Sequence, residues 1–293
     1  MASVRRACID IGSNTTRLLV AGCDRGLLEE VHQERAFTQL RRGVLDGGVI
    51  SAEKIAEVVA VVSSQLALAR ELGAAEIHGV ATAAVRRAVN GAQLIEAISD
   101  ACGLEVAVLS EEQEARMAFI GAATTLGHSP DGELGVVDVG GGSSELVVGL
   151  APDRVSWSRS FAVGSGDLAD RCLRSDPPSE SELRDADARV RNALAGIDAP
   201  HPAEVVAVGG TATSLRLFAG AVLDSAAFGR SLRLLATERA AVIAARFGID
   251  AERVRLLPAG LLILQGASEL LGAPLQIGRG GLREGVLLEA SRA

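Results

Sequence analysis

The sequence predicts a duplicated α/β protein made of two domains, and three observations support this. The chain has 293 residues, which is long for one domain and suits two of roughly 100–200 residues each. Apolar residues make up 48% of the chain and charged residues 23%, a balance that excludes disorder as the main state. The third observation is an internal repeat, in which one short motif near the N-terminus recurs in the second half.

In the first half, apolar runs bounded by turn residues predict strands, and apolar residues at helical spacing predict helices. Ser51 is expected to cap one helix that Gly73 ends, and Asn90 to cap another that Gly103 ends. The predicted strands are 4–11, 16–23, 27–35, 76–81 and 104–109, and the predicted helices are 51–72, 90–101 and 111–126.

The second half is expected to repeat this order. Ser179-Glu180-Ser181-Glu182 is a capping box that opens a helix to about Ala195. The other predicted strands and helices are 133–139, 144–150, 154–162, 204–208 and 275–277, then 211–219, 237–247, 257–271 and a last helix from 282. The domains are expected to span 1–126 and 127–293, with the last helix packing back on the first domain. Residues 174–178 are the expected linker or mobile segment.

The repeat itself carries readable chemistry. Residues 10–20 read DIGSNTTRLLV and residues 138–148 read DVGGGSSELVV. In each, a strand ends in Asp, and a glycine-containing turn then offers backbone N–H groups and hydroxyls, a combination that suits phosphate. The carboxylate can hold Mg²⁺ when phosphate is also present. Either turn alone is compatible with an ordinary hairpin, but the pair favours two phosphate loops facing each other across a cleft.

Composition excludes several other classes. The net charge of −8 argues against a nucleic-acid coat, and an aromatic content of 2% argues against base-stacking platforms. The four cysteines and four histidines are scattered, which predicts reduced thiols and no metal site built on Cys or His.

No uncharged apolar run is long enough to span a membrane, and the N-terminus lacks the pattern of a signal peptide. We therefore expect a cytoplasmic protein with neither a nucleic-acid nor a membrane partner.

Five blocks of sequence resemble one known family. They are DIGSNT at 10–15, VRRAVN at 85–90, EAR at 114–116, DVGGGSSE at 138–145 and LREGVL at 282–287. In this order they resemble the exopolyphosphatase / guanosine pentaphosphate phosphohydrolase (Ppx/GppA) family in its short, two-domain form. The family lies in the actin–Hsp70–sugar kinase superfamily. The resemblance implies duplicated ribonuclease H-like (actin-like ATPase) domains with an interdomain cleft.

The resemblance also implies an activity, a cofactor and site residues. The activity is release of terminal orthophosphate from inorganic polyphosphate, with the 5′-phosphate of pppGpp as the alternative substrate. The implied cofactor is Mg²⁺, with Mn²⁺ as an alternative, and a homodimer is compatible with the family. Glu114 corresponds to the base that activates water, and Asp138 to a carboxylate that orients water or holds metal together with Asp10 and Glu145. The implied phosphate-binding residues are Gly12, Ser13, Asn14, Thr15, Arg86, Gly140, Gly141, Gly142, Ser143 and Gly210.

The residues alone leave several points open. Three glutamates could be the base, namely Glu111, Glu112 and Glu114, and only the family motif selects Glu114. The chain departs from that motif, because the family has SGxEEAR where residues 110–116 read SEEQEAR. Arg87 is expected to point away from the site, and the segment from Arg41 to Gly43 to line the cleft entrance or to be a solvated loop.

Two other functions compete with hydrolysis. A kinase of the same superfamily would need an adenosine-pocket motif, which the sequence does not show. A non-catalytic sensor of polyphosphate or nucleotide, or a cytoskeletal relative, would gain nothing from keeping Glu114, Asp138 and Glu145 together.

Overall fold

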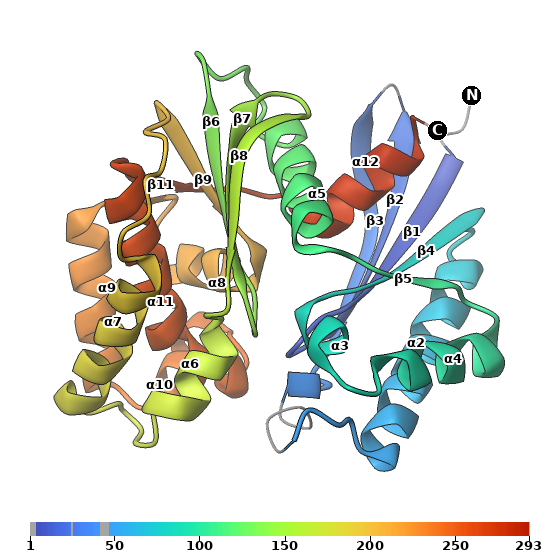
Figure 1. Cartoon of the computed structure of the whole chain (residues 1–293), viewed down its shortest axis with the longest axis horizontal. Coiled ribbons are helices and arrows are strands. Elements are labelled where there is room, and N and C mark those ends of the chain that lie inside the picture. The colour runs from blue at the N-terminus through green and yellow to red at the C-terminus, as the bar shows by residue number, and fades with distance from the viewer. Residues whose placement is uncertain (1–3, 25, 42–46, 293) are drawn as a thin grey trace.

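The computed structural model describes residues 4–24, 26–41 and 47–292, so the predicted entrance residues Arg42 and Gly43 lie outside the described residues. The strands form two sheets, and helices cover the outer face of each (Figure 1). The first sheet has the strand order β3-β2-β1-β4-β5, and the second has the order β10-β11-β9-β6-β7-β8.

The first sheet begins as an antiparallel meander, to which two parallel strands are added. Its strands are β1 (Val4–Ile11), β2 (Thr16–Asp24), β3 (Leu27–Ala36), β4 (Glu76–Ala81) and β5 (Val106–Val108). The helices that follow these strands are α2 (Ala52–Glu71), α3 (Ala83–Arg87) and α4 (Gly91–Cys102).

The second sheet repeats this topology strand for strand. Its strands are β6 (Leu134–Val139), β7 (Ser144–Leu150), β8 (Arg154–Phe161), β9 (Glu204–Val208), β10 (Val222–Leu223) and β11 (Leu275–Ile277). β6, β7 and β8 form the meander, and β9 and β11 add in parallel, as β4 and β5 do. The shared topology confirms the predicted duplication, and β10 is an addition to the second sheet.

The remaining helices complete the structure. They are α5 (Glu111–Thr124), α6 (Ser165–Cys172), α7 (Glu180–Leu194), α8 (Gly209–Ala219), α9 (Ser225–Thr237), α10 (Ala240–Phe247), α11 (Ala251–Leu271) and α12 (Leu282–Ala290).

Two of these helices, α5 and α12, lie between the sheets. α5 buries Phe119 against the inner face of the second sheet, and α12 buries Leu287 against the inner face of the first. α5 and α12 also pack on each other (Figure 1). Because each joins one half of the chain to the other, the division between residues 126 and 127 stays a prediction.

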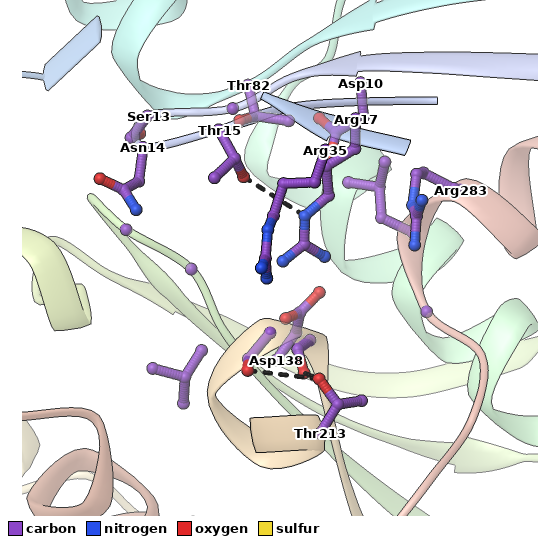
Figure 2. Close-up of a pocket in the computed structure, with 18 of the residues that line it drawn as sticks. Asp10, Ser13, Asn14, Thr15, Arg17, Arg35, Thr82, Asp138, Thr213 and Arg283 are labelled. Atoms are coloured by element: carbon purple, nitrogen blue, oxygen red, sulfur yellow. Dashed lines mark hydrogen bonds between the residues drawn. The ribbon is translucent and has the colours of Figure 1, made fainter. Parts of the chain in front are cut away.

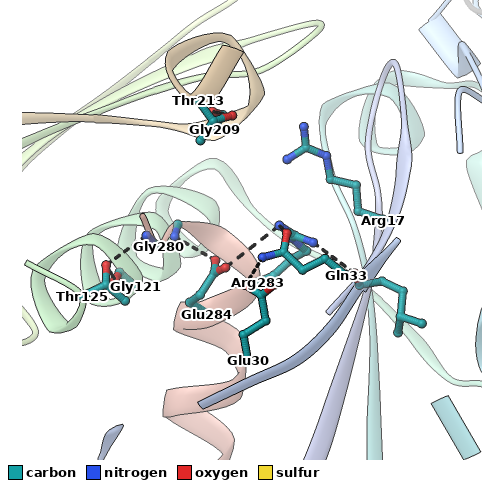
Figure 3. Close-up of polar contacts among 12 residues, drawn as sticks. Arg17, Glu30, Gln33, Gly121, Thr125, Gly209, Thr213, Gly280, Arg283 and Glu284 are labelled. Atoms are coloured by element: carbon teal, nitrogen blue, oxygen red, sulfur yellow. Dashed lines mark hydrogen bonds and ion pairs between the residues drawn. The ribbon is translucent and has the colours of Figure 1, made fainter. Parts of the chain in front are cut away.

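Glycines let these two helices approach closely. A Cβ atom at Gly285 would overlap the carbonyl oxygen of Met117, and one at Gly121 would overlap the carbonyl oxygen of Gly281. The Gly280 N–H donates to Thr125 Oγ1 at 2.9 Å where the chain enters α12 (Figure 3). The backbones of the two helices are therefore in direct contact.

Arg283 then fastens α12 to the first sheet. Its guanidinium donates to the Leu18 carbonyl and to Gln33 Oε1, both at 3.2 Å (Figure 3).

Several predicted elements need correction. Asn90 does not cap α4 with its side chain, which instead bonds both the N–H and the carbonyl of Ile50. The helix predicted to start at 237 starts at Ala240, because Glu238 is extended and separates it from α9.

The sequence did not predict α3, α6 or α9, and residues 174–178 were expected to be a linker or mobile segment. In the structure the N–H groups of Arg174 and Ser175 are held by Glu182. That carboxylate also closes the predicted capping box at Ser179, which is confirmed.

One described helix, α11, is long and apolar enough to cross a membrane by length and composition. About two-thirds of that stretch (67%) is buried inside the protein. α11 contacts α6, α7, α8, α9 and α10, so it is the central core helix of the second half.

We predict that Gly285→Ala lowers the free energy of unfolding by about 2–3 kcal/mol, because the new methyl group meets backbone that cannot yield. Urea denaturation measures this. The matched control is Gly229→Ala in α9, where the nearest atom to the new methyl group is 3.6 Å away. This control should raise stability by about 0.5–1 kcal/mol through helix propensity alone. Equal effects of the two changes would contradict the account of the α5–α12 contact.

Candidate active site

A cleft of about 630 Å³ lies where the two halves meet. Every predicted site residue except Arg86 lines it. Further lining residues that the sequence analysis did not select are Arg17, Gln33, Glu34, Arg35, Thr82, Val139, Gly209, Thr213, Arg253, Gly278, Arg279, Gly280, Gly281, Leu282, Arg283 and Glu284. The structure therefore brings the predicted residues together, and their individual roles stay predictions.

The two repeat motifs fold into the same turn. In the first loop (residues 12–15) the Gly12 N–H donates to the Thr15 carbonyl at 3.0 Å, and in the second loop (residues 140–143) the Gly140 N–H donates to the Ser143 carbonyl at 3.0 Å. A Cβ at Gly12 would lie 3.0 Å from the Thr15 carbonyl oxygen, and a Cβ at Gly140 would lie 3.0 Å from the Ser143 carbonyl oxygen. The duplication therefore extends from the order of strands to the hydrogen bonds of these loops.

Each loop is held from behind by its carbonyl groups. In the first loop, the carbonyls of Ser13 and Asn14 accept from the N–H groups of Arg41 and Gln39. In the second, the carbonyls of Gly140 and Gly141 accept from the first N–H groups of α6.

Among the described residues, the N–H groups of Ser13, Asn14, Gly141 and Gly142 make no hydrogen bond. Free backbone amides in a tight turn are suited to binding an anion.

The two loops also touch each other. A Cβ at Gly141 would lie 3.0 Å from Asn14 Cβ, and one at Gly142 would lie 2.7 Å from Ser13 Oγ. A side chain at either glycine would force the loops apart, so Gly141 and Gly142 set the distance between the halves at this point.

Four of the carboxyl groups that line the cleft are predicted site residues: Asp10, Glu114, Asp138 and Glu145. Asp10 and Asp138 lie one residue before the ends of the corresponding strands β1 and β6, and Glu145 lies opposite Asp138 on β7. Burial raises the pKa of Asp138 to about 6, opposed by the charge of Arg17 and reinforced by that of Asp10. Burial also raises the pKa of Glu145 well above its ordinary value, with the charges of Glu114 and Asp138 adding to the effect.

Glu114 reaches the cleft from the first turn of α5. Ser110 caps that helix and forms a capping box with Gln113, which stands where the family motif has a glutamate. Glu114 is buried, whereas Glu111 and Glu112 are exposed. Among the three candidate bases, only Glu114 lines the cleft.

Arg86 is the ion-pair partner of Glu114. Its Nη1 donates to Glu114 Oε2 at 3.0 Å and to the Leu109 carbonyl at 2.6 Å. Burial raises the pKa of Glu114 to about 7, against the hydrogen bond and charge of Arg86, which lower it. The structure places Arg86 against Glu114, and its predicted contact with phosphate stays a prediction.

A hard cation fits the chemistry of this site. Asp10 Oδ1 is buried with no hydrogen-bond partner in the part of the chain described, and burial raises the pKa of Asp10. The described residues contain no group of three or more His, Cys, Asp or Glu side chains placed to hold a metal on their own. A cation beside Asp10 and Asp138 would therefore take its other ligands from water and phosphate oxygens, as Mg²⁺ commonly does.

The buried Arg253 and the partly buried Arg17 are cations of the cleft that the sequence did not predict. Burial and the nearby Arg283 lower the pKa of Arg17 to about 10, and burial and the nearby Arg17 lower the pKa of Arg253 to about 9. Both stay charged at neutral pH. Arg253 Nε is buried and has no hydrogen-bond partner among the described residues.

Figure 2 shows Arg17 and Arg35 reaching across the pocket toward Asp138 and Thr213. Like-charged guanidinium groups gathered in this way favour a bound polyanion. The repeat could have revealed Arg17, because it stands opposite Asp10 as Glu145 stands opposite Asp138.

The fold and the site together define an actin-like protein in which two matched glycine-containing loops meet at a cleft. Comparison with known proteins makes this class more specific. The model of the Ppx/GppA phosphatase family matches residues 19–292. The chain belongs to this family, and the expectation of a phosphoanhydride hydrolase is confirmed.

Individual relatives agree in sequence and fold. Exopolyphosphatase 2 of Mycobacterium tuberculosis is 35% identical over 232 residues, 75% of this chain and 72% of the relative. The crystal structure of the Aquifex aeolicus Ppx/GppA family member has a TM-score of 0.83 at 29% identity, covering 99% of this chain and 98% of that chain. An exopolyphosphatase structure from Cytophaga hutchinsonii, 21% identical with a TM-score of 0.87 over 98% of both chains, supports the fold alone.

We predict that the Glu114 carboxyl titrates near pH 7 in the metal-free protein, and that Arg86→Gln moves this midpoint to higher pH. The reason is that Arg86 stabilises the ionised form, so its removal leaves only the factors that raise the pKa. Carbon-13 NMR of the labelled carboxyl measures the midpoint. Arg116→Gln is the control, because Arg116 lies on α5 with Glu114 but forms its ion pair with Glu289. A midpoint that falls or does not move in Arg86→Gln would contradict the assignment.

Proposed function

We propose that the protein is an Mg²⁺-dependent exopolyphosphatase that releases terminal orthophosphate from inorganic polyphosphate in the cleft between its halves. The observation that carries this proposal is the meeting of two matched loops with free amide groups beside the buried carboxyl of Glu114. The terminal phosphate would lie against both loops, and the rest of the chain would extend toward the arginines.

Glu114 would act as the general base. A base works best when its pKa lies near the operating pH, and burial raises the pKa of Glu114 to about 7. Arg86 keeps a share of the carboxyl ionised and fixes its direction through the 3.0 Å bond. As a carboxylate, Glu114 would accept a proton from the attacking water.

Asp10 and Asp138 would hold the metal ion. When bound, Mg²⁺ would offset the negative charge of the phosphate oxygens and of these carboxylates. Glu145 lies opposite Asp138 on the neighbouring strand and would be a third carboxylate for the metal; its Oε1 accepts a hydrogen bond from Ser160 Oγ. Mn²⁺ would suit the same oxygen ligands.

Arg17 and Arg253 support polyphosphate as the substrate. Gly210 leaves room for both, since a Cβ there would lie 2.6 Å from Arg253 Nη2 and would overlap Arg17. Two guanidinium groups so close together gain from a phosphate chain that pairs with both. The name of the M. tuberculosis relative agrees with this substrate class.

Hydrolysis of pppGpp is the second candidate function, because the same two loops would bind its 5′-phosphates. The described lining residues include no aromatic side chain on which guanine could stack, and this favours polyphosphate. A cytoplasmic location and a homodimer complete the proposal.

We predict that the protein releases phosphate from polyphosphate, that EDTA stops the release, and that Glu114→Gln lowers kcat about 10²–10⁴-fold through loss of the base. Phosphate release from polyphosphate of several lengths, pppGpp and ATP measures this. Glu112→Gln, an exposed neighbour on the same helix turn, is the matched control. Full turnover by Glu114→Gln would disprove the assignment of Glu114 as the base. Phosphate release from pppGpp but not from polyphosphate would show that the nucleotide is the substrate.

A further inference from the structure

Arg41 is a buried cation that the proposed reaction does not use. Its side chain is only 4% exposed. Its Nη1 donates to Asn14 Oδ1 of the first loop. Its Nη2 and Nε donate to Asp170 Oδ2 at 2.8 and 3.1 Å, and Nε lies 3.8 Å from Asp167 Oδ1. One guanidinium thus connects the first loop with α6 of the other half.

The contact with Arg41 decides which way the Asn14 amide faces. A guanidinium has donors only, so Asn14 must present its oxygen to Arg41 and its NH₂ group elsewhere. Asn14 lines the cleft, and its Nδ2 is buried without a hydrogen-bond partner in the described residues. Figure 2 shows this nitrogen nearer the middle of the pocket than the amide oxygen. The missing partner is a hydrogen-bond acceptor, as a phosphate oxygen would be.

Arg41 also contacts α6, the helix whose N-terminus binds the second loop. Asp167 and Asp170 lie on α6, and the first N–H groups of that helix bind the carbonyls of Gly140 and Gly141 at 2.9–3.0 Å. Gly166 leaves space for the guanidinium, since a Cβ there would lie 2.5 Å from Arg41 Nε. The first loop, Arg41, α6 and the second loop form one continuous chain of contacts.

Arg87 makes a parallel bridge. It also comes from the first half, and its Nη1 donates to the Gly142 carbonyl at 3.0 Å. The sequence analysis expected Arg87 to point away from the site, whereas the structure places it on the second loop. Arg87 of the first half therefore contacts the second loop directly, whereas Arg41 reaches it only through α6.

We propose that Arg41 is a positioning residue, which turns the NH₂ group of Asn14 toward the bound phosphate and holds the two loops in register. The proposal rests on the proposed function, because it requires a phosphate chain in the cleft. Arg41 acts through Asn14 and does not touch the substrate. Its removal weakens substrate binding while Glu114 and the metal-binding carboxylates keep their places.

The test is a double-mutant cycle between Arg41→Met and Asn14→Ala, with KM and kcat for polyphosphate as separate readouts. Arg41→Met raises KM about tenfold and leaves kcat within about threefold. In the Asn14→Ala background, Arg41→Met adds less than about twofold, because the amide that it orients is gone. Arg41→Lys, which still donates one hydrogen bond, recovers part of the loss. Additive effects in the cycle, or equal losses in kcat and KM, would overturn the proposal.

Two further variants protect the test against a folding defect. Asp170→Ala leaves Arg41 in place but removes one anchor, and it raises KM about threefold only when Asn14 is present. Arg292→Gln breaks the ion pair with Asp153, and neither residue lines the cleft, so it is the control for loss of an arginine pair. A KM effect of Arg292→Gln equal to that of Arg41→Met would also overturn the proposal.

Binding separates this inference from the proposed function. Calorimetric titration of tripolyphosphate into Glu114→Gln gives a Kd that does not depend on turnover. If the wild-type protein releases no phosphate but Arg41→Met still weakens tripolyphosphate binding about tenfold, the proposed function fails and the role of Arg41 stands. If the wild-type protein releases phosphate and Arg41→Met leaves the Kd unchanged, the role of Arg41 fails alone.

Discussion

The contact between the two glycine-containing loops is the constraint on which the site depends. Gly141 and Gly142 lie directly against Ser13 and Asn14, with no room for a side chain between them. At the other end of the interface the α5–α12 contact is equally close, with Gly285 against the α5 backbone. The halves are thus fixed at two places, and the cleft between them receives the ends of both repeated strands.

Electrostatics gives this cleft its chemistry. Burial raises the pKa of Glu114 and Asp138 and lowers that of Arg17 and Arg253. The protein therefore removes both negative and positive groups from the water that would stabilise their charged forms. In the proposed function, a metal ion would offset the negative charge of the carboxylates, and a phosphate chain would offset the positive charge of the guanidinium groups. A net charge of −8 is therefore no obstacle to a polyanionic substrate, since the positive charge is local.

The local signals of the sequence predicted much of the fold. The strands 76–81 and 144–150 have the predicted limits, and the repeat located both loops. The features that the sequence did not predict depend on contacts between segments that are far apart in the chain. α6 begins in a glycine-rich segment, and its role comes from holding the second loop. Arg253 becomes a site residue only because α11 brings it beside Arg17 and Gly210.

The central claim is that one terminal phosphate is bound by both loops at once. A crystal structure of Glu114→Gln with Mg²⁺ and tripolyphosphate tests it most directly. The account predicts a terminal phosphate within hydrogen-bond distance of amides from the first loop, such as Ser13, and from the second, such as Gly142. A phosphate chain bound by one loop only, or at the start of α8 away from both, would contradict it.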